Sequence, residues 1–168
     1  DRVVYQTQTA YQRIVMTEWK GYHWLYINGN VQFSTYDEER YHEPLVHPAM
    51  KLAGSRAHVL ILGGGDGLAV REVVKYAEVK TVTLVDLDAT MIDLALTYPA
   101  IVEANQGALS DHRVTVEIGD AGTFLEQSGK LYDVIIVDLP DPKGPDLARL
   151  YSRGFYRLCK RHLTADGV

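Results

Sequence analysis

Residues 59–67 read Val-Leu-Ile-Leu-Gly-Gly-Gly-Asp-Gly, an apolar run that ends in a cluster of glycines. The run is typical of a buried parallel strand. Gly63, Gly65 and Gly67 form a GxGxG turn, in which backbone without Cβ atoms can approach a ligand closely. Such turns usually receive a nucleotide at the N-terminus of the next helix. The stretch therefore predicts an α/β fold that binds a ligand containing a nucleoside.

Asp66 lies among these glycines and argues against a phosphate ligand, because its carboxylate would repel one. The part of the ligand near this turn is therefore expected to be cationic. An adenosyl sulfonium compound fits this requirement, whereas a dinucleotide fits poorly. A nicotinamide dehydrogenase is also disfavoured because the glycines follow GxGxG rather than GxGxxG.

The composition is that of an ordinary globular protein, with 168 residues, 46% hydrophobic and 23% charged. A net charge of −5 argues against nonspecific nucleic-acid binding. Cys159 is the single cysteine, so there is no disulfide framework and no CxxC metal motif. No apolar run is long enough for a membrane span. We expect a cytoplasmic chain without membrane contact or bound metal. Surface or helix-end roles are expected for His47, His58, His112 and His162.

The N-terminal part predicts antiparallel strands. Residues 11–35 alternate and are rich in β-forming side chains, with hairpin signals at 20–21 and 28–30. We assign residues 1–36 to a small β-meander and residues 37–168 to a Rossmann-like domain.

The rest of the chain alternates short β-branched runs with helical stretches, which predicts a parallel sheet with helices on both faces. Residues 37–53 have helical spacing, with Pro44 and Pro48 marking an irregular start. The chain ends in a turn signal before Val168, which resembles the start of another strand, so we expect a C-terminally incomplete domain. The predicted strands are His58–Leu62, Thr81–Val85, Val114–Ile118 and Asp133–Val137; the predicted helices are Leu68–Tyr76, Ala89–Leu96, Ala121–Gln127 and Asp146–His162.

Acidic residues end or follow each predicted strand. The carboxyl ends of parallel strands are where open α/β sheets bind ligands, so a shared pocket is expected. Asp86 lies 21 positions after Gly65, the spacing of an acid that binds ribose hydroxyls; helix capping is the alternative, but Asp88 fills that role better. The acids in question are Asp66, Asp86, Asp120 and Asp138, with Asp141 three residues beyond the last.

Two of these acids have a second interpretation that the sequence leaves open. Asp120 lies either near an adenine amino group or at the cap of the helix over 121–127. Asp138-Leu139-Pro140-Asp141-Pro142 holds two carboxylates on a stiff loop, although Asp-Pro is also ordinary turn chemistry. Carboxylates facing Asp66 would repel one another unless a cation bound between them, and that cation would be the substrate.

Taken together, these motifs resemble the spermidine synthase family of polyamine aminopropyltransferases. The resemblance implies a methyltransferase-like Rossmann domain after an N-terminal β-meander, and a homodimer. It also implies transfer of an aminopropyl group from decarboxylated S-adenosylmethionine to a polyamine acceptor such as putrescine, with release of methylthioadenosine. It rests on Gly63–Gly67, Arg71-Glu72, Gly119-Asp120, Asp138-x-x-Asp141-Pro142, Tyr11-Gln12, Tyr41-His42-Glu43-Pro44, Gly144-Pro145 and Leu150-Tyr151.

The resemblance also implies roles for individual residues. Asp138 matches the general base, and Tyr41 matches a tyrosine that assists it. The nucleoside would be held by Gln12, Asp86, Asp120, Ala121 and Pro145, with the turn glycines Gly63 and Gly65. The aminopropyl chain and the amine acceptor would be surrounded by His42, Asp66, Asp138 and Asp141.

Three positions depart from the family pattern. Asp86 replaces a glutamate, Leu139-Pro140 replaces two serines, and Ala121 replaces a glycine. The paired-aspartate loop looks most like that of a bacterial subgroup whose catalytic domain follows membrane helices, which implies a membrane-anchored parent protein.

Elementary chemistry agrees with this reading. A free amine has a pKa of roughly 10, so it must lose a proton before it can attack the carbon next to a sulfonium. A carboxylate at Asp138 can accept that proton. Asp66 would repel the α-carboxylate of intact S-adenosylmethionine and accept the decarboxylated form. The alternatives are an S-adenosylmethionine-dependent methyltransferase and a noncatalytic nucleoside-binding domain.

Overall fold

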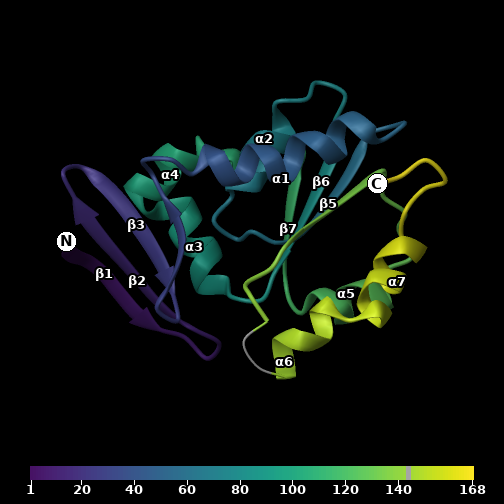
Figure 1. The fold of residues 1–168 in the computed structure, drawn as a ribbon. Coiled ribbons are helices and arrows are strands. Elements are labelled where there is room, and N and C mark those ends of the chain that lie inside the picture. Colours follow the sequence, from purple (N-terminus) through teal and green to yellow (C-terminus); the bar gives the residue numbers. More distant parts are fainter. Residues whose placement is uncertain (143–144) are drawn as a thin grey trace.

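The computed structural model describes residues 1–142 and 145–168, apart from the side chains of Pro145 and Asp146 (Figure 1). The N-terminal part is a four-stranded antiparallel sheet whose strands follow sequence order, which confirms the predicted meander. Its first strand lies before the alternating stretch that the sequence singled out. The strands are β1 (Arg2–Gln8), β2 (Arg13–Trp19), β3 (Tyr22–Ile27) and β4 (Asn30–Ser34).

Both predicted hairpin turns are present. Lys20 and Gly21 connect β2 to β3, and Asn28 and Gly29 connect β3 to β4. All four residues have positive φ angles, between 51° and 84°. Two consecutive left-handed residues give a turn whose twist matches that of the strands, which is why Asn-Gly predicts hairpins well.

Helix α1 (Glu39–Leu52) follows the meander and runs without interruption through Pro44 and Pro48. The expectation that these prolines mark an irregular start was therefore wrong. Proline costs a helix one hydrogen-bond donor. Here the cost is offset by a buried face of His42, Val46 and Met50, which lie four residues apart and pack together.

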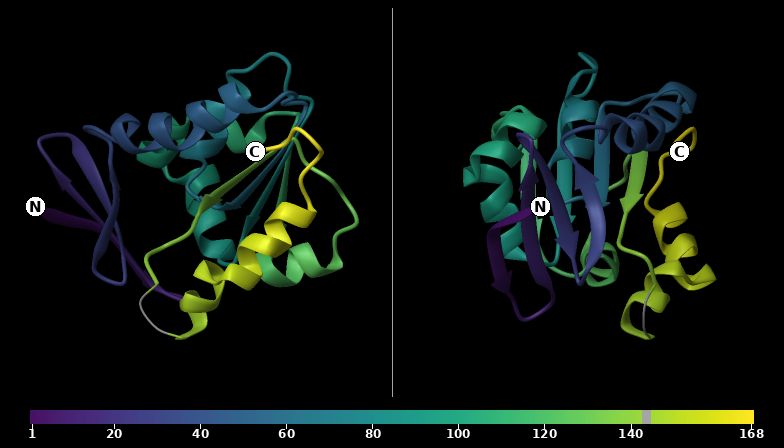
Figure 2. Two further views of the ribbon diagram at one scale, coloured as in Figure 1. Left: turned by 45° about the vertical axis from the view of Figure 1, so that its right-hand side comes forward. Right: turned by 60° about the vertical axis from the view of Figure 1, so that its left-hand side comes forward.

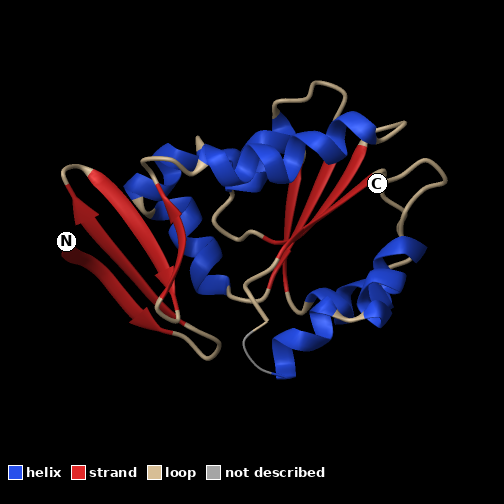
Figure 3. Ribbon diagram, in the orientation of Figure 1, coloured by secondary structure: helices blue, strands red, loops and turns tan. Residues whose placement is uncertain are grey.

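The second sheet is parallel and has the strand order β7-β6-β5-β8 (Figure 3). This order places the glycine-rich end of β5 between the ends of β6 and β8, so the sheet brings their acids to one edge. The strands are β5 (His58–Gly63), β6 (Thr81–Asp86), β7 (Val114–Ile118) and β8 (Val134–Asp138). The helices between them are α2 (Leu68–Val74), α3 (Ala89–Thr97), α4 (Pro99–Asn105) and α5 (Ala121–Gln127), with a 3-10 turn at Ala108–Ser110.

Helices cover both faces of this sheet, as the alternation predicted (Figure 2). Successive side chains of β5 point to opposite faces of the sheet. Val59 and Ile61 join a core with α1 to α4 and the meander, whereas Leu60 and Leu62 join a core with α5 and α7. The structure thus confirms a Rossmann-like parallel sheet. Among the described residues, no helix combines the length and the apolar character needed to cross a bilayer.

The single helix predicted over 146–162 is wrong. The structure has α6 (Pro145–Ala148), a 3-10 turn at Arg149–Tyr151 and α7 (Arg153–Arg161). Ser152 separates the last two, because it is extended and its Oγ accepts a hydrogen bond from Phe155 N at 3.1 Å. Beyond α7, Val168 N donates to Asp133 O at 3.0 Å, which matches the expected strand-like start at that residue.

Candidate functional site

The glycine turn closes tightly on the acids of the neighbouring strands. Gly63 lies in register with Asp138, and a Cβ atom added to Gly63 would stand 2.0 Å from the carbonyl oxygen of Asp138. A Cβ atom on Gly65 would stand 2.6 Å from Asp86 Oδ2. Glycine is thus favoured at both positions by the protein itself, at Gly63 by the backbone of Asp138 and at Gly65 by the carboxyl group of Asp86. Ligand contact by Gly63 and Gly65 stays a prediction.

Asp138 lies at the end of β8 and is bound by Tyr41 of α1. Tyr41 Oη donates to Asp138 Oδ1 over 2.8 Å. Burial and repulsion by Asp66 raise the pKa of Asp138 to about 6, although the hydrogen bond from Tyr41 opposes this shift. Burial and the Asp138 carboxylate likewise raise the pKa of Tyr41, so Tyr41 remains a donor. A carboxylate with a pKa near neutrality is suited to general-base catalysis.

Asp66 stands at the start of α2, where its Oδ1 accepts a hydrogen bond from Leu68 N at 2.9 Å. Burial raises the pKa of Asp66, and the charge of Asp86 adds to this effect. Burial also raises the pKa of Asp86, and the charges of Asp88 and Asp138 add to this effect. Three of the four strand-end acids, Asp66, Asp86 and Asp138, therefore interact electrostatically, as expected for a shared site.

Asp86 is not a helix cap. Its Oδ2 accepts from Gly65 N at 3.0 Å and its Oδ1 from Asp88 N at 2.9 Å. Asp88 caps α3 instead, because its Oδ1 accepts from Thr90 N at 3.0 Å. This confirms the sequence-based assignment of the cap to Asp88 rather than Asp86. Asp86 thus reaches back to the glycine turn, and its contact with a ribose stays a prediction.

Asp120, which the sequence left open, caps α5. Its Oδ1 accepts from Thr123 N at 2.9 Å, and the carboxylate is paired with Arg149. Although burial opposes the change, the hydrogen bonds from Arg149 and Thr123 lower the pKa of Asp120. Its proposed contact with adenine stays a prediction, and the adenine would have to share the carboxylate with Arg149.

The remaining predicted residues differ in their burial. Gln12 is half-buried, and its carbonyl oxygen accepts from Thr9 N at 2.9 Å. Ala121 is buried as the first residue of α5. Asp141 is exposed on the loop after β8. The prediction for Pro145 concerns a side chain outside the described residues, as does Gly144 as a whole. The roles of these residues in binding stay predictions.

Sequence reasoning gave no role to two groups. The first is a buried network behind His42, in which Glu38 and Arg71 are 4% and 5% exposed. Arg71 was named in a motif of the family resemblance without a role, and Glu38 was not singled out. The second is Tyr151, whose hydroxyl lies 2.9 Å from Leu139 O and 2.8 Å from Pro140 O. Tyr151 thereby ties down the backbone between the two aspartates.

Replacing Tyr151 with phenylalanine should loosen this loop, because both carbonyl groups lose their donor. We expect a loss of about 1 kcal/mol in unfolding free energy and faster amide exchange at Leu139 and Asp141. Tyr156→Phe is the matched control, since Tyr156 is 49% exposed. Hydrogen exchange measured by mass spectrometry checks this, and equal exchange in both variants would contradict it.

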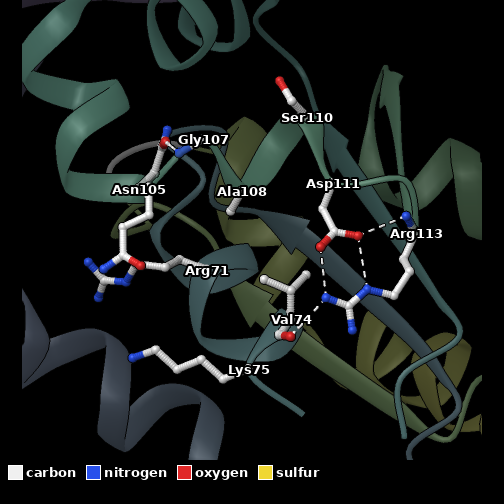
Figure 4. Close-up of a pocket in the computed structure, with 10 residues that line it drawn as sticks. Arg71, Val74, Lys75, Asn105, Gly107, Ala108, Ser110, Asp111 and Arg113 are labelled. Atoms are coloured by element: carbon white, nitrogen blue, oxygen red, sulfur yellow. Dashed lines mark hydrogen bonds and ion pairs between the residues drawn. The ribbon is translucent and has the colours of Figure 1, made fainter. Parts of the chain in front are cut away.

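A separate cavity of about 370 Å³ opens between α2 and the segment after α4 (Figure 4). It is lined by Lys75, Asn105 and Arg113 among others. Arg113 is paired with Asp111 at 2.7 Å, and Lys75 Nζ lies 2.6 Å from Glu72 Oε2. None of the strand-end acids lines this cavity, so it is not the candidate active site.

His47 departs from its expected surface role. It is half-buried, with Nε2 3.0 Å from Glu72 Oε2 and Nδ1 2.7 Å from Tyr76 Oη. His47, Glu43 and Glu72 form a group whose potential metal-binding atoms lie within 4.8 Å of one another. Lys75 already binds both oxygens of Glu72, at 2.7 and 2.6 Å, so no metal is proposed there.

The fold and the acid-lined edge of the sheet define a methyltransferase-like α/β domain preceded by a β-meander. Residues 38–168 match the spermine/spermidine synthase domain, and the chain belongs to that family. Solved structures agree: a spermidine synthase in complex with the transition-state analogue AdoDATO superimposes with a TM-score of 0.91 at 33% identity, covering 99% of this chain and 56% of that one. The spermidine synthase of Thermotoga maritima gives a TM-score of 0.88, also at 33% identity, covering 99% of this chain and 55% of that one.

Curated relatives are longer than this chain. It is 49% identical over 168 residues to polyamine aminopropyltransferase 2 of Ralstonia nicotianae and 48% identical to the polyamine aminopropyltransferase of Oceanobacillus iheyensis. Each alignment covers 100% of this chain and 33% of the relative. The chain thus spans about a third of the length of these relatives.

Proposed function

We propose that the protein transfers an aminopropyl group from decarboxylated S-adenosylmethionine to a polyamine. The observation that carries this proposal is the Asp138–Tyr41 pair at the carboxyl end of β8, with Asp66 close enough to raise the pKa of Asp138. The relatives named as polyamine aminopropyltransferases support it. The protein is then a transferase with two small-molecule substrates and no permanently bound cofactor.

The reaction is an in-line displacement. The acceptor amine gives up a proton to the Asp138 carboxylate, and its nitrogen lone pair attacks the aminopropyl carbon next to the sulfonium. The carbon–sulfur bond breaks, its electron pair passes to sulfur, and methylthioadenosine leaves as a neutral thioether. Tyr41 holds Asp138 in place through its hydroxyl. Because the carboxylates of Asp66 and Asp138 repel one another, a cationic substrate between them relieves an unfavourable interaction.

The remaining roles extend this proposal. Asp141 and His42 help to bind the amine, and Asp86 binds the ribose. Asp120 and Gln12 bind the methylthioadenosine part together with Ala121 and Pro145. We further propose that this domain forms a homodimer and lies in the cytoplasm. We also propose that the longer parent protein is anchored in the membrane.

A product assay tests the function directly. The protein is incubated with decarboxylated S-adenosylmethionine and a panel of putrescine, spermidine, agmatine and cadaverine, and methylthioadenosine is measured. Formation of methylthioadenosine only when an amine is present supports the proposal. Methyl transfer from intact S-adenosylmethionine would favour a methyltransferase, and binding without turnover would favour a noncatalytic domain.

Asp66→Asn should narrow the preference for the decarboxylated substrate. Asparagine removes both the attraction for the aminopropyl ammonium and the repulsion of an α-carboxylate. The affinity for decarboxylated S-adenosylmethionine should therefore fall, and the affinity for intact S-adenosylmethionine should rise. Each change is expected to be about 10-fold, the effect of a hydrogen bond to a charged group. Isothermal titration calorimetry with both compounds checks this. Unchanged affinities would show that Asp66 does not face the ligand.

A further inference from the structure

A chain of buried charged and polar side chains lies behind the candidate site. Glu38 precedes α1, His42 lies on α1, and Arg71 lies on α2. All three are at most 5% exposed. Burying such groups is costly unless each one has a partner. The contacts among them are therefore expected to be specific.

Arg71 holds the carboxylate of Glu38. Its Nη1 donates to Glu38 Oε1, and its Nη2 donates to Glu38 Oε2 over 3.0 Å. The same guanidinium donates to Ala104 O over 2.7 Å and, through Nε, to Glu72 Oε1 over 2.8 Å. A guanidinium has donors and no acceptor, so both oxygens of the Glu38 carboxyl group accept hydrogen bonds from it. Glu38 is thus a fixed acceptor.

His42 meets this acceptor with one ring nitrogen. Its Nδ1 lies 2.9 Å from Glu38 Oε2 and 2.9 Å from the carbonyl oxygen of Glu38. Neither oxygen can donate a hydrogen, so Nδ1 must carry one. In the neutral ring the lone pair is then on Nε2. The surroundings of Nδ1 decide the tautomer of the whole side chain.

The ring also lies close to the acids of the candidate site. Burial raises the pKa values of Asp66 and Asp138, and a positive charge placed on His42 would oppose both shifts, so the ring lies within electrostatic range of both carboxylates. The ring centroid of Tyr41, whose hydroxyl binds Asp138, stands 5.0 Å from that of His42. The charged and titratable groups that face His42 are Glu38 and Tyr41 around α1, Asp66 after β5 and Asp138 at the end of β8, with Arg71 of α2 behind Glu38.

We propose that Glu38, held by Arg71, is a positioning residue that fixes the Nδ1-protonated tautomer of His42, so that Nε2 offers a lone pair to an amine N–H beside Asp66 and Asp138. This inference rests on the proposed aminopropyl transfer. No bond to carbon is made or broken in this contact, and the proton that leaves the amine still goes to Asp138.

Glu38→Gln tests the proposal, because the amide offers Arg71 one acceptor oxygen in place of two, and we expect that oxygen to stay at the Oε1 position, in the contact with Arg71 Nη1. The amide nitrogen then takes the place of Oε2 and presents a donor to His42 Nδ1. We expect the Nδ1-protonated tautomer to lose population in ¹⁵N NMR spectra of histidine-labelled protein, with His42 assigned from a His42→Gln variant. The KM for putrescine should rise about 10-fold or more, while the KM for decarboxylated S-adenosylmethionine stays unchanged.

Glu72→Gln is the matched control. Glu72 also binds the Arg71 guanidinium, at 2.7 Å, but the contacts of His42 Nδ1 are to Glu38. This variant should retain the wild-type tautomer and the wild-type KM for putrescine. If the population of the Nδ1-protonated tautomer of His42 falls in both variants, Glu38 has only a general structural role and the inference is overturned.

The wild-type spectrum decides the matter even if Glu38→Gln does not fold. A proton on Nε2 of His42, in a neutral or a charged ring, would overturn the inference outright, whereas a neutral ring protonated on Nδ1 alone supports it. This result does not depend on turnover. Absence of aminopropyl transfer by the wild-type protein would instead overturn the proposed function, so the two failures are distinguishable.

Discussion

Replacing Asp138 with asparagine is expected to lower the rate of aminopropyl transfer by about 10²–10⁴-fold, the usual contribution of a general base. Asparagine has nearly the same shape and still accepts the hydrogen bond from Tyr41, but it cannot take a proton from the amine. Affinity for methylthioadenosine should remain within a few-fold. Single-turnover kinetics and calorimetry measure the two quantities separately.

The wild-type rate should also depend on pH in a defined direction. The base must be ionised to act, and the pKa of Asp138 is raised to about 6. The rate is therefore expected to fall as the pH decreases through about 6. Asp93→Asn is the control for the loss of one carboxylate, because Asp93 is exposed on α3. Full activity of Asp138→Asn, or a rate that stays constant between pH 7 and pH 5, would remove Asp138 from the role of base.

Asp138→Asn should lower activity but raise the stability of the fold. A carboxyl whose pKa is raised in the folded state binds its proton more tightly there than in the unfolded chain. Its ionisation therefore destabilises the fold at pH 7, and this cost disappears as the pH falls below about 4. Asparagine carries no charge, so Asp138→Asn should raise the unfolding free energy at pH 7 by roughly 1–3 kcal/mol. A higher melting temperature with lower activity is the expected combination.

Gly63→Ala is expected to have the largest effect on folding. Gly63 has a φ angle of +82°, and an added Cβ atom would overlap the carbonyl oxygen of Asp138 at 2.0 Å. Because this oxygen belongs to the backbone of the neighbouring strand, β5 and β8 would have to separate. We expect a loss of about 4 kcal/mol or more in unfolding free energy, measured by chemical denaturation.

Gly29→Ala separates the overlap from the backbone strain. Gly29 has nearly the same φ angle, +81°, but an added Cβ atom would meet no atom within 4 Å. The unfolding free energy of this variant should fall only by the cost of placing an alanine in a left-handed conformation, about 1–2 kcal/mol. If both variants lose the same free energy, the approach of Asp138 to the turn is not what requires glycine at position 63.

Local patterns in the sequence predicted the elements that depend on neighbouring residues. The Asn-Gly pair at 28–29 predicted a hairpin, and Asp88 predicted the cap of α3. The apolar run over 59–62 predicted the central strand, with its glycines at one end. The failures were local signals that other contacts outweighed. Pro44 and Pro48 did not disturb α1, because its buried face packs against the core.

What the sequence by itself determined was the alternation of strands and helices around the parallel sheet and the presence of an acid at each strand end. Hydrophobic periodicity and capping act within a few residues, so they can be read along the chain. Only the tertiary structure decided which groups meet: Tyr41 binds Asp138 across 97 positions, and Arg71 binds Glu38 across 33. Such pairs depend on how α1 and α2 pack against the parallel sheet. The partners and pKa values of buried charges follow from that packing, because burial and neighbouring charge set them.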